Sequence, residues 1–313
     1  MTIFPYINKV ITVFGGAGFI GSHLCDELLS ANPKKLIIFD NLSASSIDNV
    51  KQLLTDARVE FINGDVRDYD TVEKYVLQSD FIFNLAAGNV GNSVINPRID
   101  LETNIIGTFN ILKACTKKPS IRMVHASSGS VVNASTPYAI SKSAGENYCL
   151  FFAKECGVKI TVARYYHVFG KRQDSHGKCG VINIFLSVIL KGYPPIIWGD
   201  GFAIKNFTYV LDTVRATLML AENEDTIGKI YDIASETKIT IKELAETLIK
   251  LYSKDKNLKP IYDKPKIGEN MQLFPDTKPI RELGWYPKYA FVDALNLTKL
   301  WMDYQLKLRE DTK

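Results

Sequence analysis

Gly15-Gly16-Ala17-Gly18-Phe19-Ile20-Gly21 follows the short apolar run Val10 to Phe14 and opens an amphipathic stretch near 18–31. Glycines at this spacing, between a predicted strand and a predicted helix, are typical of the phosphate-binding turn of dinucleotide-binding proteins. The first glycine permits a tight turn, the second lets the backbone approach a pyrophosphate, and the third lets helix and strand pack closely. Because the helix N-terminus also presents free N–H groups to an anion, the stretch predicts a nucleotide-binding βαβ unit.

The second predicted strand ends at Asp40, 19 residues after Gly21. A carboxylate at this position accepts hydrogen bonds from the ribose hydroxyls of adenosine. It would also repel the 2′-phosphate of NADP. The spacing therefore predicts NAD as the cofactor.

Apolar runs rich in β-branched residues alternate with amphipathic segments through the first half of the chain. Each parallel crossover needs a connecting element, and near-continuous apolar strands are covered on both faces. The alternation therefore predicts an α/β protein with a doubly wound parallel Rossmann sheet. The predicted strands are 10–14, 36–39, 59–62, 81–85, 121–125 and 158–163, and the predicted helices lie near 18–31, 70–78, 97–116 and 137–156.

The pattern changes after about residue 168. Glycine and proline cluster at 192–195 and 199–201, and helical patterns follow near 210–223, 240–253 and 290–308. We therefore expect an NAD-binding Rossmann domain over 1–168 and a smaller C-terminal α/β substrate-binding lobe, mainly 169–313. Segments near 205–235 are expected to return to the first domain.

Composition excludes several classes of protein. Of 313 residues, 46% are hydrophobic and 23% charged, and the excess of four positive charges is scattered, so we expect a folded chain that binds no nucleic acid. No apolar run is long enough to span a bilayer and the first nine residues lack a signal-peptide pattern, which predicts a cytoplasmic protein away from membranes. The five cysteines and four histidines show no metal-binding spacing, so no metal is expected.

Tyr138 and Lys142 lie four residues apart on the predicted helix that Thr136 and Pro137 begin. Residues at this spacing share a helix face, so the ammonium group can approach both a cofactor ribose and the phenol. A nearby cation favours phenolate, which would let Tyr138 act as a base although a free phenol has a pKa of about 10. Ser127-Ser128, at the end of the fifth predicted strand, adds a hydroxyl at the carboxyl edge of the sheet, where open α/β sheets bind ligands.

These motifs resemble, in order and over nearly the whole chain, the extended short-chain dehydrogenase/reductases that act on nucleotide sugars. The resemblance implies that Ser128, Tyr138 and Lys142 form a catalytic trio. Tyr138 would take the proton of a sugar hydroxyl while hydride passes to NAD, and Ser128 would orient the reacting oxygen. The matching segments are 15–24, 40–43, 64–68, 84–87, 104–108, 137–142, 164–166, 207–210 and 283–285.

The resemblance also implies two sets of ligand contacts. The cofactor set comprises Gly15, Gly18, Phe19, Ile20, Gly21, Asp40, Asn41, Ser43, Asp65, Val66, Leu85, Ala86, Ala87, Asn104, Tyr138, Lys142, Tyr165 and Val168. The substrate set comprises Ser93, Ser128, His167, Val181, Lys205 and Lys266. Lys205 and Lys266 stand where the family has arginine and keep the charge but not the bidentate fork. An ordinary hydrogen-bonded core histidine is an equal alternative for His167.

Two departures from the family narrow the chemistry. Gly129 and Ser130 follow Ser128 where dehydrating members carry Asp-Glu and decarboxylating members carry Ser-Glu. Without those groups the chemistry should stop at reversible hydride transfer, at C4 of the sugar. Tyr138 is also only the tenth residue after Ser128, whereas the family has a longer loop between these positions. The shorter loop predicts a roomier pocket near the reacting carbons.

The sequence therefore indicates an NAD-dependent nucleotide-sugar 4-epimerase or 4-dehydrogenase of surface-polysaccharide biosynthesis, working through a 4-keto species. The short loop and the lysines argue against an ordinary UDP-glucose 4-epimerase and leave a GDP-manno-heptose-type 4-dehydrogenase, with net formation of NADH, as an alternative. A non-catalytic NAD-binding regulatory protein is disfavoured by the intact trio. Tyr148, Phe151 and Phe152 predict a homodimer through the helices near 97–116 and 137–156.

Overall fold

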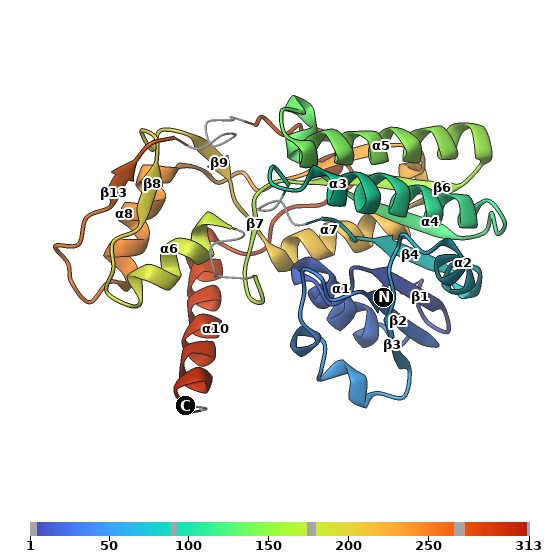
Figure 1. Cartoon of the computed structure of the whole chain (residues 1–313), viewed down its shortest axis with the longest axis horizontal. Coiled ribbons are helices and arrows are strands. Elements are labelled where there is room, and N and C mark those ends of the chain that lie inside the picture. Colours follow the sequence, from blue (N-terminus) through green and yellow to red (C-terminus); the bar gives the residue numbers. More distant parts are fainter. Residues whose placement is uncertain (1–4, 89–92, 174–179, 266–272, 312–313) are drawn as a thin grey trace. The chain divides into compact units, whose positions relative to one another are not determined.

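The computed structural model describes residues 5–88, 93–173, 180–265 and 273–311, and its centre is a seven-stranded parallel sheet (Figure 1). The strands lie in the order β11-β6-β5-β4-β1-β2-β3. From β1 the chain adds strands toward one edge of the sheet, and from β4 onward it adds them toward the other edge, as in doubly wound folds. The predicted fold class is thus confirmed. The strands are β1 (Val10–Phe14), β2 (Lys35–Asp40), β3 (Val59–Asn63), β4 (Phe81–Asn84), β5 (Arg122–Ser128), β6 (Lys159–Tyr165) and β11 (Ile230–Ile233).

Helices cover both faces of this sheet. Successive side chains of a strand point to opposite faces of the sheet, and both faces are buried, so the strands are apolar at nearly every position. In β2, Leu36 and Ile38 enter one hydrophobic cluster, and Ile37 and Phe39 enter the other. The first cluster contains α1 (Phe19–Ser30) and α7 (Val210–Glu222), and the second contains α2 (Tyr69–Gln78), α4 (Thr108–Cys115) and α5 (Pro137–Cys156).

The single helix predicted near 97–116 is three elements in the structure. These are α3 (Pro97–Asp100), the π-helix η4 (Leu101–Gly107) and α4. Gly107 permits this segment to lie close to the loop that follows β3, since a Cβ on it would come within 2.4 Å of the Val66 side chain. The prediction of a helix near 97–116 is confirmed, since the chain is helical throughout 97–115. Hydrophobic spacing does not reveal that the helix widens locally in η4.

Contacts divide the chain into two compact units. The first comprises Met1–Tyr165, Thr213–Ile233 and Asp276–Trp285, with the short helices η1 (Ile47–Asn49), η2 (Leu53–Thr55), η5 (Gly129–Asn133), η6 (Glu224–Thr226) and α9 (Lys278–Glu282). The second comprises Tyr166–Asp212, Ala234–Pro275 and Tyr286–Lys313.

Three short two-stranded ladders replace a continuous sheet in the described part of the second unit. They pair β7 (Val168–Phe169) with β10 (Thr208–Tyr209), β8 (Ile196–Trp198) with β13 (Ile261–Asp263), and β9 (Ile204–Asn206) with β12 (Lys238–Thr240). Its helices are α6 (Val181–Ile189), α8 (Ile241–Tyr252) and α10 (Phe291–Asp311), and a Thr240–Glu243 capping box begins α8. Across the ranges that the structure describes, every helix is too short or too polar to cross a bilayer.

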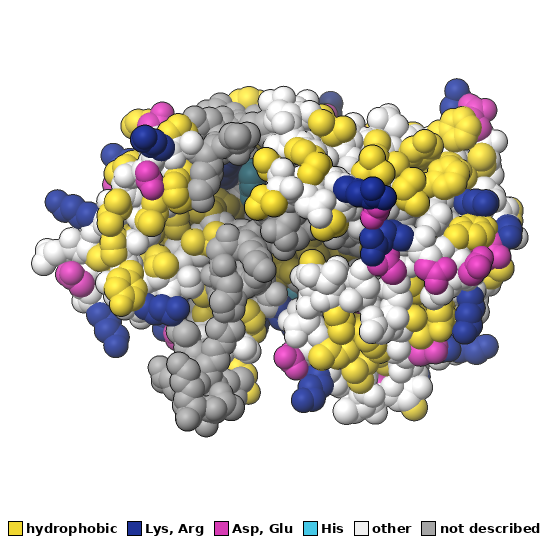
Figure 2. Space-filling model, in the orientation of Figure 1, with side chains coloured by type: hydrophobic (Ala, Val, Ile, Leu, Met, Phe, Trp, Pro, Cys, Tyr) yellow, Lys and Arg dark blue, Asp and Glu magenta, His cyan; other side chains and the backbone are white. Residues whose placement is uncertain are grey.

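Exposed apolar side chains lie on three neighbouring elements of the first unit. Ile99 of α3, Leu101 and Ile106 of η4, and Tyr148 and Phe151 of α5 are each at least 40% exposed. Figure 2 shows hydrophobic side chains over α5 and the helices beside it. Since isolated domains rarely expose this many neighbouring apolar groups, the face is suited to a protein contact.

Candidate active site

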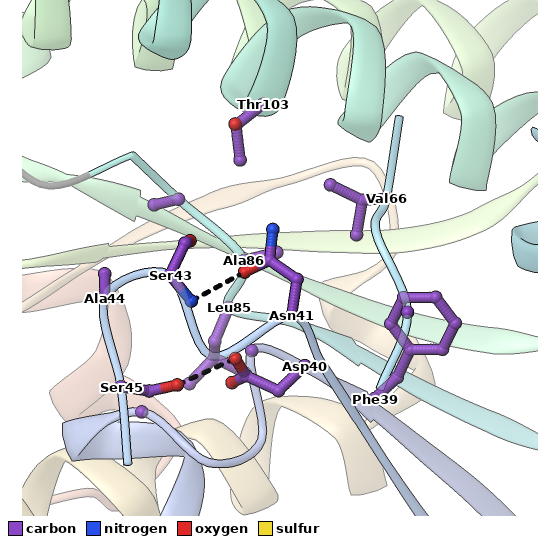
Figure 3. A pocket seen from close by; sticks show the side chains of 14 residues that line it. Phe39, Asp40, Asn41, Ser43, Ala44, Ser45, Val66, Leu85, Ala86 and Thr103 are labelled. Carbon is purple, nitrogen blue, oxygen red and sulfur yellow. Dashed lines mark hydrogen bonds between the residues drawn. The ribbon is translucent and has the colours of Figure 1, made fainter. Parts of the chain in front are cut away.

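A cavity lies at the carboxyl ends of β1 to β4, the edge where doubly wound sheets bind ligands (Figure 3). Nine residues predicted to contact the cofactor line it: Gly15, Gly18, Asp40, Asn41, Ser43, Val66, Leu85, Ala86 and Ala87. The remaining lining residues are Phe39, Ala44, Ser45, Gly64 and Thr103. The structure therefore brings five separate sequence segments to one concave surface.

The glycine turn leaves no space for side chains. Gly15 has φ +75°, and a Cβ on it would lie 2.8 Å from the Ala86 main-chain nitrogen. A Cβ on Gly21 would lie 2.2 Å from the Gly15 carbonyl oxygen. Gly18 is the N-cap of α1, and among the described residues no side chain caps this helix. Phe19 and Ile20 therefore present their N–H groups at the helix start, as a bound pyrophosphate requires.

Asp40 is 8% exposed at the end of β2 and holds the turn in place. Its Oδ2 accepts the Ala17 N–H at 3.0 Å, and its Oδ1 accepts the Leu42 N–H at 2.9 Å and the Ser45 hydroxyl at 2.8 Å. The Ser45 bond is drawn in Figure 3. A carboxylate so fixed has a defined direction from which a ribose diol can approach it, and the site fits NAD.

Asp40→Ala is expected to raise the Kd for NAD about 10- to 100-fold, because a ribose hydroxyl would lose a charged acceptor. Discrimination against NADP should weaken in the same variant, since no carboxylate would face the 2′-phosphate. Titration of both dinucleotides by calorimetry measures this. Asp48→Ala removes an exposed aspartate of η1 and serves as the control, and equal NAD affinity in the two variants would contradict the assignment of Asp40.

Asp65 follows β3 and makes ion pairs rather than lining the cavity. Its carboxylate accepts from Arg67 Nε at 2.9 Å and from Asn41 Nδ2 at 3.0 Å. The hydrogen bonds from Arg67 lower the pKa of Asp65 to about 2. Arg67 also donates to Glu102 of η4 at 2.9 Å. This pairing fixes the loop that carries Val66. Asp65 does not line the cavity, and its predicted contact with the adenine remains a prediction.

The first turn of α5 is capped twice. Thr136 Oγ1 accepts the Ala139 N–H at 3.2 Å, and Ser93 Oγ accepts the Tyr138 N–H at 2.8 Å from a loop 45 residues earlier. Pro137 occupies the first turn, where its missing N–H has no cost. The Ser93 hydroxyl, predicted to contact substrate, is therefore used to hold the backbone of Tyr138.

Lys142 lies one turn further along α5 and is 2% exposed. Its Nζ donates to the Ala126 carbonyl oxygen of β5 at 2.6 Å, which leaves two donors for other partners. Burial lowers the pKa of Lys142 to about 8, while Cys149, Glu146 and Asp100 raise it. The ammonium ion is therefore close to its titration range at neutral pH.

Ser128 ends β5, two residues after the carbonyl group that Lys142 contacts. Its hydroxyl lies 2.9 Å from the Ser130 hydroxyl and accepts the Ser130 N–H at 3.2 Å, as the cap of η5. Either hydroxyl can donate in this pair, and when Ser130 donates, the Ser128 proton is available for a substrate oxygen. Ser130 thus supports Ser128 at the position where eliminating relatives were expected to carry glutamate.

Asn104 joins the cofactor loop to the catalytic helix. It is 1% exposed in η4, its Oδ1 accepts the Gly88 N–H at 3.0 Å, and its Nδ2 donates to Ser141 of α5 at 2.9 Å. Gly145 allows the close approach of η4, since a Cβ on it would lie 2.9 Å from the Asn104 carbonyl oxygen. The predicted cofactor residue Asn104 therefore positions neighbouring backbone.

Other predicted residues have different surroundings. Tyr165 of β6 places its hydroxyl 2.8 Å from Thr217 of α7, and burial raises its pKa. Val168, predicted to contact the cofactor, lies in β7 of the second unit. Lys266 falls outside the described residues.

His167, Val181 and Lys205 all belong to the second unit. His167 has φ +39°, and its buried Nε2 has no hydrogen-bond partner in the described part of the chain. Burial and the neighbouring Lys205 lower the pKa of His167 to about 3, so the ring is neutral. A strained, neutral histidine with an unpaired nitrogen favours a ligand contact over a satisfied core residue.

Sequence reasoning missed two groups beside the trio. Glu146 and the partly buried Arg164 form an ion pair, in which Glu146 also accepts the Ser127 hydroxyl, and neither was assigned a role. The only available signal was that Glu146 lies four residues after Lys142 on the same helix. Arg164 stood in the matching segment 164–166, but nothing in the sequence paired it with Glu146.

Comparisons with known proteins agree with this geometry. The model of the NAD dependent epimerase/dehydratase family matches residues 11–234. A Methanocaldococcus jannaschii protein with a provisional UDP-glucose 4-epimerase name is 36% identical, over 94% of this chain and 98% of its own. A UDP-N-acetyl-alpha-D-glucosaminuronate decarboxylase of Bacillus cytotoxicus is 29% identical, over 94% and 98%.

Solved structures with the same fold include three 4-epimerases of UDP-sugars. The UDP-glucose 4-epimerase of Thermotoga maritima, solved with UDP-glucose, has a TM-score of 0.86 and 32% identity, covering 95% of this chain and 99% of its own. A UDP-N-acetylglucosamine 4-epimerase of Methanobrevibacter ruminantium has a TM-score of 0.88 and 29% identity, covering 96% and 99%. The NAD complex of the Thermus thermophilus UDP-glucose 4-epimerase has a TM-score of 0.82 and 28% identity, covering 93% and 98%.

Proposed function

The chain belongs to the NAD-dependent epimerase/dehydratase family, and from this premise we propose that it is a 4-epimerase of a UDP-sugar. It is an NAD-dependent enzyme of the nucleotide-sugar class, similar to 4-epimerases. The observation that carries the proposal is that Lys142, on the helix that also carries Tyr138, contacts Ala126 of β5, two residues before Ser128 ends that strand. No carboxylate stands at positions 129 and 130. Acid–base groups for elimination are missing there, so hydride transfer is the chemistry that remains.

NAD bound in the cavity supplies a reversible hydride acceptor at the sugar carbon. Tyr138 would remove the proton of the C4 hydroxyl while the C4 hydrogen leaves as hydride to the bound NAD. It would return that proton to the C4 oxygen when the hydride comes back to the opposite face of the turned keto sugar. Lys142 stabilises the phenolate form of Tyr138 and holds a cofactor hydroxyl. Ser128 donates a hydrogen bond to the C4 oxygen, supported by Ser130.

UDP-sugars are favoured over the GDP-heptose alternative by the relatives named for UDP-glucose and UDP-N-acetylglucosamine 4-epimerisation. His167 and Lys205 of the second unit are the proposed contacts of the diphosphate, together with Lys266. Ser93 and Val181 complete the proposed substrate set. A role in surface-polysaccharide biosynthesis is part of the same proposal.

An anaerobic incubation of the purified holoenzyme with UDP-glucose, UDP-galactose, their N-acetyl forms and GDP-mannose tests the function. We expect an isomer of unchanged mass from a UDP-sugar, with no net NADH absorbance. Accumulating NADH with a product two hydrogens lighter would identify a dehydrogenase and overturn the epimerase proposal. Conversion of GDP-mannose alone would overturn the choice of nucleotide.

The exposed apolar face of α3, η4 and α5 is proposed as a homodimer contact. Tyr148 and Phe151 are 40% and 55% exposed on α5, whereas Phe152 is 7% exposed and packs against Phe109 in the core. The prediction that all three aromatic residues form an interface therefore fails for Phe152, because its ring belongs to the second hydrophobic cluster.

Phe151→Glu is expected to weaken the dimer at least about tenfold, since a charge would be desolvated at the contact. Sedimentation velocity over a range of protein concentrations measures the change. Tyr193→Glu, at an exposed aromatic residue of the second unit, is the control. A wild-type protein that sediments as a monomer at all concentrations, or a Phe151→Glu dimer of unchanged affinity, would rule out this contact.

A further inference from the structure

Glu146 is a buried carboxylate of α5 that the proposed reaction does not use. It is 5% exposed, and its Oε2 accepts the Ser127 hydroxyl of β5 and Arg164 Nε of β6, each at 2.9 Å. Its Oε1 pairs with a second nitrogen of the Arg164 guanidinium group. A buried carboxylate costs free energy unless it is paired in this way, so the group needs an explanation.

The ion pair continues to the neighbouring strand. Arg164 Nη1 lies 3.8 Å from Asp232 Oδ1 of β11, and Asp232 Oδ2 accepts the Asp276 N–H at 2.9 Å. One guanidinium group therefore faces two carboxylates.

Glu146 and Lys142 contact consecutive residues of β5. Lys142 Nζ donates to the Ala126 carbonyl oxygen at 2.6 Å, and Glu146 accepts the hydroxyl of Ser127. Ser128 follows directly. Two side chains of α5, one turn apart, thus fix this helix against the strand that ends in the proposed catalytic serine.

We propose that Glu146 is a positioning residue, which keeps Lys142 as an ammonium ion beside Tyr138 and fixes α5 against the Ser128 end of β5. The proposal rests on the function assigned above to Tyr138 and Lys142. It assigns a role in that reaction to a residue that touches neither substrate nor cofactor.

The charges around Lys142 support this role. Burial lowers the pKa of Lys142, and Cys149, Glu146 and Asp100 oppose that shift. Burial also raises the pKa of the Cys149 thiol, which is therefore neutral in the working range. His125 of β5 faces Lys142 as well, and burial with the Lys142 charge lowers its pKa, so it is uncharged. The carboxylates of Glu146 on α5 and Asp100 on α3 are then the anions that keep Lys142 protonated.

The test replaces Glu146 by glutamine in the holoenzyme, which keeps the size of the side chain and removes the charge. The alkaline limb of the pH–turnover profile, measured with UDP-galactose and UDP-glucose, is expected to move about one unit lower, because Lys142 would lose its proton earlier. Ser127→Ala is the matched control, since it removes a hydrogen bond of Glu146 without its charge. It should lower turnover by a common factor at every pH and leave the limb in place.

A second readout needs NAD but no sugar. The tyrosinate absorbance of each protein is titrated against the same protein carrying Tyr138→Phe, so that the difference reports Tyr138 alone. Ionisation of Tyr138 is expected at higher pH in Glu146→Gln than in the wild type, since an uncharged Lys142 no longer stabilises phenolate. Superimposable titrations of folded proteins would overturn the proposal, whatever the sugar specificity.

The double variant Glu146→Gln with Arg164→Gln is the second version of the test, for the case that Glu146→Gln does not fold. This variant does not leave the Arg164 guanidinium group without Glu146 as its partner. The pKa of Tyr138 is again expected to be higher than in the wild type. If the titrations shift but no sugar is turned over, the proposed function fails and the role of Glu146 stands. If epimerisation needs Tyr138 but neither readout moves, the role of Glu146 fails and the function stands.

Discussion

Tyr138→Phe is expected to lower epimerase turnover roughly a thousandfold or more while NAD stays bound, because the variant loses the only oxygen assigned to move the C4 proton. Folding should be preserved. Thr136 and Ser93 accept main-chain N–H groups at the start of α5, and these bonds do not depend on the phenol. Turnover of UDP-galactose and the NAD content of the purified protein are measured together.

Tyr148→Phe is the matched control, since it removes a phenol oxygen from an exposed position of the same helix. It should turn over within about twofold of the wild type, as surface substitutions do. A Tyr138→Phe enzyme within tenfold of the wild type would remove Tyr138 from the role of base. Loss of both turnover and NAD would instead place the residue in cofactor binding.

Gly21→Ala is expected to abolish retention of NAD and to lower the melting temperature by roughly 5–10 °C. A Cβ on Gly21 would lie 2.2 Å from the Gly15 carbonyl oxygen, and backbone cannot give way as a flexible side chain can. The start of α1 would have to move away from β1, which displaces the N–H groups that face the pyrophosphate. NAD content after gel filtration and thermal unfolding measure the two effects.

Gly157→Ala tests whether the effect is specific to the turn. Gly157 is the C-cap of α5 with φ +69°, and a Cβ on it meets no atom within 4 Å. This variant therefore carries backbone strain of about 1 kcal/mol without a clash at the cofactor site. NAD should be retained. Equal NAD loss in both variants would show that general destabilisation, rather than the turn, accounts for the result.

Local patterns of the sequence were sufficient for the fold and the cofactor. The glycine turn and Asp40 lie within one βαβ unit, so their spacing alone brings them to one cavity. The nearly continuous apolar runs predicted the parallel sheet, because each of its strands is buried on both faces and contributes side chains to both hydrophobic clusters. The helical spacing of Tyr138 and Lys142 likewise placed both on one face of α5.

Other features depend on contacts between segments that are distant in sequence. The Ser93 hydroxyl accepts the Tyr138 N–H across 45 residues, a contact that its place in the sequence did not indicate, and its role toward substrate stays a prediction. The π-helix η4 forms where Asn104 joins the Gly88 loop to Ser141, and hydrophobic spacing does not encode this junction.

The sequence by itself thus determined the sheet, the dinucleotide turn and the pair on α5, since each depends on spacing within one or two adjacent elements. Only the tertiary structure decided the electrostatic surroundings of Lys142. Glu146, Ser127 and Arg164 come from α5, β5 and β6, and they meet because the parallel strands end at one edge under this helix. Burial and pairing of charges are properties of that packed arrangement, so the four-residue spacing of Lys142 and Glu146 could not by itself indicate them.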